Sequence, residues 1–334
     1  MTRFVRLLDA FWFAPAPAAR LAVLRILIGA FAFVLVADHY SAWVEISRTS
    51  PSLFEPVGVA VVLDRPLPPE VFQGLLLACL AANGAFVLGW RHRGTGPVFA
   101  ALLLGVLCYR NSWSMIYHSA NLVVLHVLIL GVAPAADALS LDARRRAGQR
   151  AGRNPAGDWR YGWPIRLICA VTVVTYFLAG VAKVAGPLGW SWATGTALRS
   201  QVAADALRKE VLGEASSPLF AALYDHVWLF AILAAGSLAL ELGAPLALLS
   251  RRLAWGWAVS AFLMHWGIFF IMGITFRYHL AGVAFAPFFA VEHILPWLWP
   301  PAIRDGLARA WPQRSEVGGR HALGLGPLKG ESDT

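Results

Sequence analysis

The stretch IRLICAVTVVTYFLAGVAK, residues 165–183, decides the fold class of this chain. Between its arginine and its terminal lysine it is almost entirely apolar or small, and a helix needs roughly 20 such residues to cross the hydrocarbon core of a bilayer. Similar apolar stretches recur along the chain, and together they predict an all-α, polytopic membrane helical bundle of about eight spans. The eight expected spans are residues 21–37, 70–90, 97–109, 118–134, 165–183, 226–249, 254–275 and 278–299.

The composition agrees with this fold class. Of 334 residues, 58% are apolar and 14% are charged, whereas soluble domains are near half apolar and a quarter charged. The formal charge of +9 invites a nucleic-acid role, but the basic residues form short clusters between the apolar stretches, which excludes that class. The three cysteines lie inside apolar stretches, so we expect buried thiols and no metal site.

The distribution of Lys and Arg predicts the orientation. With the N-terminus in the cytoplasm, 19 of these residues fall on the cytoplasmic side and 8 on the other side, as the positive-inside rule requires. We therefore expect both termini in the cytoplasm and a multi-pass protein of the cell (inner) membrane. Residues 1–300 form the expected transmembrane domain, and residues 301–334 form an expected cytoplasmic tail that is partly disordered.

Ionisable side chains inside apolar helices need a partner or a function. With this orientation His118, Lys183, Arg277 and His279 meet at the outer side, although a snorkelling lysine, a capping histidine and an ordinary loop pair are the more common explanations of such residues. Glu241 lies deeper, near mid-span, as does His265; these two residues either pair with each other or with Arg25, or line a cavity.

Helical spacing groups further candidates. Tyr176, Gly180 and Lys183 share one face of a helix, and His118 and Asn121 share one face of another. A small residue beside an aromatic ring and a lysine admits either a planar lipid-soluble ligand or a closely packed helix.

A family resemblance adds to this interpretation. The segment TYFLAGVAKVAGPLGWSWATGTALR, residues 175–199, resembles the YF-x-AGV-x-K motif, followed by Trp-x-x-G, of the vitamin K-dependent γ-carboxylase and its prokaryotic relatives. Those relatives form the HTTM (horizontally transferred transmembrane) domain family. Further segments resemble the family in the same order: ARLAVLRILIGAF near the start, RNSWSMIYHSANLVVLHVLIL before the fourth span, and LELGAPLALLSRRLAWGWAVSAFLMHWGIFFIMGITF in the last third.

The resemblance implies specific roles. In the γ-carboxylase the motif lysine is the base that deprotonates vitamin K hydroquinone, whose reaction with oxygen then yields a base strong enough to deprotonate a peptide glutamate. For this chain the resemblance implies that Lys183 is the catalytic base, that His118 is its electrostatic partner, and that a reduced, vitamin K-like quinone is the cofactor. The expected substrate-binding residues are Asn121, Tyr176, Trp190, Arg277 and His279.

The sequence leaves three classes of function open. The first is a γ-carboxylase-like membrane enzyme that acts on a quinol, another small lipid-soluble substrate or a peptide in an outward-facing pocket. The second is a non-catalytic binding, maturation-accessory or immunity protein. The third and weakest is a transporter with a relay through Glu241, His265 and Arg25, for which no inverted repeat is evident.

Overall fold

A computed structural model describes residues 2–113, 116, 118–146 and 157–294. The chain divides into two units, Met1–Glu292 and His293–Thr334, and the first unit holds the helices of the expected bundle. In the described residues every regular element is helical, and one isolated β-bridge joins Ala16 to Asp158. The predicted all-α membrane bundle is therefore confirmed as a fold class. The expected tail, residues 301–334, lies outside the described residues.

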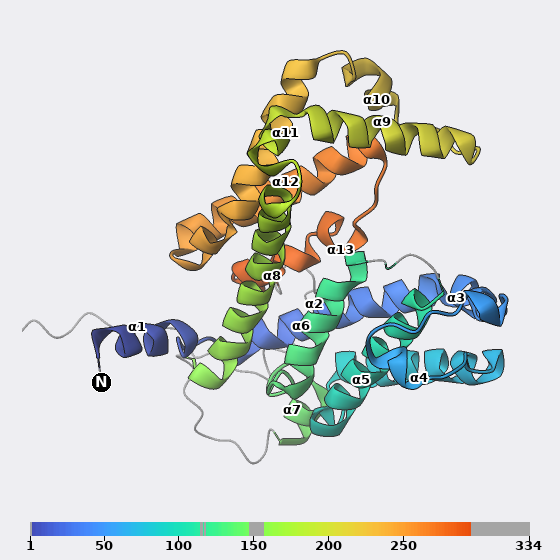
Figure 1. The fold of residues 1–334 in the computed structure, drawn as a ribbon. Coiled ribbons are helices and arrows are strands. Elements are labelled where there is room, and N and C mark those ends of the chain that lie inside the picture. Colours follow the sequence, from blue (N-terminus) through green and yellow to red (C-terminus); the bar gives the residue numbers. More distant parts are fainter. Residues whose placement is uncertain (1, 114–115, 117, 147–156, 295–334) are drawn as a thin grey trace, which may run out of the picture. The chain divides into compact units, whose positions relative to one another are not determined.

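Within the described ranges, five helices of at least 20 residues dominate the fold (Figure 1). They are α2 (Ala18–Asp38), α4 (Pro69–Leu88), α5 (His92–Asn111), α8 (Trp159–Ala185) and α12 (Arg251–Met272). Among the described helices, α2, α4, α8 and α12 are long and apolar enough to cross a membrane. Large apolar side chains such as Val34, Leu77, Leu178 and Leu263 are exposed on these four helices, which water would penalise and lipid does not.

The described part of the chain also contains shorter helices. They are α1 (Arg3–Trp12), α3 (Tyr40–Ile46), α6 (Asn121–Val132), α7 (Leu141–Arg146), α9 (Thr196–Val211), α10 (Pro218–Leu223), α11 (Val227–Leu242) and α13 (Arg277–Leu280). Short 3-10 helices are η1 (Pro51–Leu53), η2 (Gly58–Val62), η3 (His118–Ala120), η5 (Gly189–Thr194), η6 (Ala244–Leu248), η7 (Val283–Phe288) and η8 (Val291–Ile294). Of these, α6 and α11 are apolar but shorter than a full span.

The N-terminal half packs α2, α4, α5 and α6 against one another (Figure 1). Glycines set the closest crossing, between α5 and α6. A Cβ atom at Gly96 would lie 2.5 Å from the carbonyl oxygen of Gly131, and a Cβ atom at Gly131 would lie 2.9 Å from the carbonyl oxygen of Gly96. Because such contacts are closer than side-chain atoms tolerate, only a glycine at both positions lets the two backbones touch.

Helix α8 joins this half to the C-terminal half. It contacts α2 and α6 on one side, and α11 and η6 on the other. Helix α12 in turn packs against η6, η7 and α11, and α9 packs against α11 and α12. Side chains of α8 therefore pack against the N-terminal half of the protein as well as against the C-terminal half.

Arg25 ties the N-terminal half together. Its guanidinium is fully buried and donates hydrogen bonds of 2.7 Å to the carbonyl of Ala135, 3.1 Å to that of Val87 and 2.7 Å to that of Leu139. These carbonyls end α4 or lie in the turn after α6, where no helical N–H is available for them. The expected pairing of Arg25 with Glu241 or His265 is therefore not what the structure has.

Four expected spans differ from the observed helices. The fourth, 118–134, is η3 followed by α6, and the sixth, 226–249, is α11 followed by η6, so neither is one helix of spanning length. The third apolar stretch, 97–109, belongs to a 20-residue helix, α5, because polar residues from His92 onward extend it. The eighth, 278–299, is not one helix in its described part: α13, η7 and η8 follow one another with a break at Gly282, whose φ is +73°. A proline, Pro287, also lies inside η7, and proline interrupts a continuing helix.

Candidate functional site

The candidate site is built on the last turn of α8. Asp158 caps the N-terminus of this helix by accepting a hydrogen bond from the backbone N–H of Arg160, and the helix then continues for 27 residues. Lys183 lies in its final turn, where the helix dipole favours a positive charge.

Lys183 forms an ion pair with Glu241, which lies in the last turn of α11. The Lys183 Nζ atom is 2.5 Å from both carboxylate oxygens of Glu241. The lysine side chain is 25% exposed, whereas that of the glutamate is 8% exposed. The carboxylate is thus buried, and the ammonium lies between it and the surface. Charge-assisted hydrogen bonds of this kind are among the strongest in proteins.

Gly180 makes this pair possible. A Cβ atom at Gly180 would lie 2.9 Å from Cβ of Glu241 and 3.1 Å from Cγ of Leu242. Helix α11 therefore reaches α8 only because position 180 has no side chain, one turn before Lys183. Of the two neighbours that sequence spacing allows at this position, a flat ligand or a helix, the structure has the helix.

An aromatic ring completes the surroundings of the lysine. The ammonium of Lys183 lies 4.8 Å from the centroid of the Trp192 ring, within the range of a cation–π interaction. Trp192 is buried in η5, and the turn after it ends at Gly195, whose φ is +85°. Trp190, the tryptophan predicted from the sequence, lies in the same turn but is 68% exposed.

A second cluster lies further back along α8, around the buried Tyr176. The Tyr176 hydroxyl is 3.3 Å from Nδ1 of His265, and the same nitrogen donates to the carbonyl of Ala261 at 2.8 Å. The His265 ring stacks on that of His279, with centroids 4.3 Å apart and planes within 6°. The mid-span His265 is thus accommodated by α8, α12 and α13, without Glu241.

A buried chain of hydrogen bonds holds His126. Thr172 donates its hydroxyl proton to the carbonyl of Ile168 at 3.0 Å, so its oxygen accepts from Nε2 of His126, also at 3.0 Å. The other ring nitrogen, Nδ1, lies 2.7 Å from the hydroxyl oxygen of Tyr278, within hydrogen-bond distance. This chain of hydrogen bonds connects α6, α8 and α13.

Comparison of the sequence with protein-family models identifies the family of the chain. The model of the HTTM domain matches residues 13–292, most of the chain. The chain belongs to the HTTM domain family. The chain matches no curated protein and no solved structure. Membership makes it an integral, multi-pass membrane protein of the γ-carboxylase-related family, in agreement with its apolar helices.

The remaining predicted site residues of this HTTM protein are dispersed. Asn121 is exposed at the first residue of α6. Arg277 is exposed and forms an ion pair with Asp38, at the end of α2. Among the described residues, neither these two side chains nor Trp190 forms a hydrogen bond or an ion pair with Lys183 or Glu241.

His118 has only a partial description. Its backbone begins η3, which contacts α6 and α13, but its side chain lies outside what the structure describes. The predicted pairing of His118 with Lys183 therefore stays a prediction. Within the described residues, no group of three or more His, Cys, Asp and Glu side chains is arranged to hold a metal ion.

Two neighbours of Lys183 in the HTTM protein were not predicted as such, and both had a signal in the sequence. Glu241 is an acidic residue in an apolar helix, and such a residue needs a cation. Trp192 with Gly195 fits the Trp-x-x-G part of the family motif, whereas Trp190 does not. In both cases the signal was present, but the identity of the partner required the packing of α11 and η5 on α8.

Proposed function

We propose that this HTTM protein is a membrane enzyme in which Lys183 and Glu241 together remove a proton from a weakly acidic, lipid-soluble substrate. A reduced quinone is the proposed cofactor or substrate class. One observation carries the proposal: a lysine on a membrane helix, still 25% exposed, whose ammonium lies against both oxygens of a buried carboxylate. A lysine that only snorkelled toward the headgroups would not need a buried anion.

The pair offers a proton transfer without a change in net charge. Lys183 passes one N–H proton to an oxygen of Glu241 while it takes up the proton of a substrate hydroxyl. One N–H and one O–H bond break, and one N–H and one O–H bond form. Lys183 keeps its positive charge, Glu241 becomes neutral, and the negative charge moves to the substrate oxygen beside the ammonium. In a low-dielectric site this avoids the cost of creating a new, unpaired charge.

The residues around the ammonium fit a planar phenolic group. Lys183 supplies an N–H donor with an exposed side, and the face of Trp192 lies 4.8 Å from its nitrogen. An aromatic, apolar neighbour beside a charged donor suits a phenol, because the phenol oxygen reaches the donor while its ring stays out of water. A bound quinol would supply the acidic hydroxyl and, with oxygen, the redox chemistry that a side chain lacks.

The test uses the full-length protein purified in detergent and supplied with a reduced naphthoquinone. Oxygen-dependent quinone formation is followed by absorbance, and quinone retained through purification is measured by mass spectrometry. We expect Lys183→Ala and Glu241→Gln to lower the rate by about 10²-fold or more, as for loss of an acid–base group. Lys183→Arg should fail as well, because a guanidinium keeps its proton.

The control is Arg208→Gln, which changes an exposed cation on α9. It should leave the rate unchanged. A wild-type protein that neither retains nor oxidises the quinol, or a Lys183→Ala variant as active as wild type with normal folding, would overturn the proposal. Either outcome would favour a non-catalytic binding or maturation-accessory role.

A further inference from the structure

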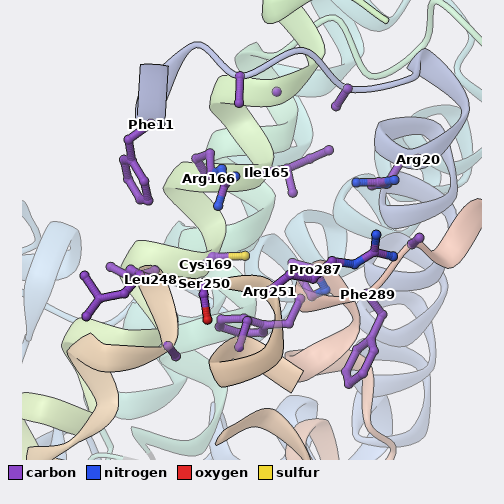
Figure 2. Close-up of a pocket in the computed structure, with 18 of the residues that line it drawn as sticks. Phe11, Arg20, Ile165, Arg166, Cys169, Leu248, Ser250, Arg251, Pro287 and Phe289 are labelled. Atoms are coloured by element: carbon purple, nitrogen blue, oxygen red, sulfur yellow. The ribbon is translucent and has the colours of Figure 1, made fainter. Parts of the chain in front are cut away.

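A cavity of about 380 Å³ lies at the other end of α8 (Figure 2). It is lined by the first turns of α2 and α12 and the first three turns of α8, together with residues from η6, η7 and the segment after α1. Its volume falls in the range of small-molecule sites, roughly 300–1,000 Å³. We call it the basic cavity, and define it by Arg20, Arg166, Ser250 and Arg251, which line it from three different helix starts.

The basic cavity carries an excess of positive charge. None of the described residues that line it is acidic. Arg20 is bound through two hydrogen bonds, of 2.8 and 2.6 Å, to Glu292. Arg166 lies instead over the ring of Phe11 at 5.0 Å, and Arg251 lies over the ring of Trp255 at 4.6 Å. In the described part of the chain, Arg166 and Arg251 form no ion pair, so both remain available to an anion.

The backbone adds to this positive field. Ser250 caps α12 by accepting a hydrogen bond from the backbone N–H of Leu253 at 3.3 Å. The N-terminus of this 22-residue helix thus opens into the cavity beside Arg251. Helix N-termini attract anions through their free N–H groups and their dipole.

The other lining residues are apolar. Figure 2 shows Ile165, Leu248, Pro287 and Phe289 around the same cavity as the arginines. A freely soluble anion makes no favourable contact with apolar side chains, whereas a lipid presents a charged headgroup and apolar chains together. The three helix starts also fall on the side that the distribution of Lys and Arg assigns to the cytoplasm.

We propose that the basic cavity binds the phosphate group of an anionic phospholipid from the cytoplasmic leaflet, with Arg166 and Arg251 as its ligands. The site is distinct from the proposed proton-transfer site. Arg166 and Lys183 are 17 residues apart on α8, which corresponds to about 25 Å along a helix. The inference therefore does not depend on the proposed function.

Lipid retention tests the proposal. The full-length protein in a neutral detergent is titrated with phosphatidylglycerol or, as a zwitterionic comparison, phosphatidylcholine, and bound lipid is counted by native mass spectrometry. We expect one tightly held phosphatidylglycerol on the wild type. The double variant Arg166→Gln/Arg251→Gln should bind it about tenfold or more weakly, since the loss of even one charged hydrogen bond is worth about that factor.

Three further measurements make the result decisive. Arg252→Gln, next to Arg251 but outside the cavity lining, should bind like wild type. Arg166→Lys/Arg251→Lys should recover most of the affinity. Phosphatidylglycerol should raise the melting temperature of the wild type but not of the Gln double variant, which must first be shown to elute as a folded monodisperse species.

Contrary results are equally clear. Equal retention of phosphatidylglycerol by the wild type and the Gln double variant would overturn the proposal, as would equal retention of phosphatidylcholine. Displacement of the lipid by millimolar inorganic phosphate would also overturn it, because the site would then recognise free phosphate rather than a lipid.

Discussion

At the scale of residues, the Lys183–Glu241 pair is the central feature. An unpaired carboxylate in an apolar helix is costly, and removing one partner of a buried ion pair costs more than the pair itself contributes. Glu241 is buried and Lys183 is partly exposed, so an unpaired charge costs more free energy at Glu241 than at Lys183. This asymmetry makes the two single substitutions unequal.

We expect Lys183→Met to be destabilising by about 1–3 kcal/mol and Glu241→Leu to be destabilising by less, because only the first leaves a buried charge without a partner. The double variant should be more stable than the sum of the two effects predicts. Unfolding of the detergent-solubilised protein by sodium dodecyl sulfate, followed by circular dichroism, measures all three.

The exposed pair of Arg48 and Glu45, at 3.4 Å, is the matched control. A double-mutant cycle on it should give a coupling of about 0.5 kcal/mol or less, as for exposed pairs. Strictly additive effects at Lys183 and Glu241 would mean that the two side chains are not paired in the membrane protein.

At this scale the sequence identifies which residues are unusual but not what they contact. Lys183, Glu241 and His265 stand out as ionisable groups in apolar helices, yet Glu241 pairs with Lys183 rather than with His265 or Arg25. The packing of the two helices decides the partner: the last turn of α11 lies against Gly180 of α8, which brings Glu241 to Lys183. Apolar stretches alone do not reveal which turns of two helices meet.

At the scale of elements, glycine positions decide how closely helices approach. Gly180 on α8 faces Glu241 and Leu242 on α11, whereas Gly236 on α11 has open space where its Cβ atom would be. The same substitution should therefore have opposite effects on the two helices.

We expect Gly180→Ala to be destabilising by about 1–3 kcal/mol, as for overpacking of a close contact, and to lower any activity that needs the Lys183–Glu241 pair. Gly236→Ala should be neutral or stabilising by up to about 1 kcal/mol, because alanine is the better helix former. The melting temperatures of the two variants in detergent compare them directly. A Gly180→Ala variant as stable as Gly236→Ala would contradict the close crossing.

The sequence predicts the long helices better than the short ones. Residues 21–37, 70–90, 165–183 and 254–275 correspond to α2, α4, α8 and α12. The stretch 278–299 is also rich in apolar residues, but a glycine with positive φ and an internal proline divide its described part into turns. Hydropathy measures whether a segment avoids water, and turns packed against other helices satisfy that condition as well as a span does.

At the scale of the whole molecule, helix direction has a consequence that can be measured. The basic cavity gathers the starts of α2, α8 and α12 at one level, as alternating spans require. The excess of Lys and Arg predicts that this level faces the cytoplasm, and that the loop between α9 and α10 faces the other side.

Thiol labelling in intact cells tests this orientation. In a variant without its three native cysteines, Glu214→Cys should react with a membrane-impermeant maleimide, whereas Arg145→Cys should react only after the membrane is permeabilised. Both positions are exposed, so access to water is matched. Labelling of Arg145→Cys in intact cells, with Glu214→Cys protected, would show that the topology is the reverse of the predicted one.

The hydrogen bonds of Arg25 also bear on how the chain is synthesised. The carbonyl of Ala135 lies 110 residues downstream of Arg25, so at translation rates of about 5–20 residues per second the guanidinium waits roughly 5–20 s for that acceptor. Until then the guanidinium in the first long helix lacks two of its three close carbonyl acceptors. We therefore expect the start of this helix to stay near the headgroups until the fourth apolar segment has been synthesised.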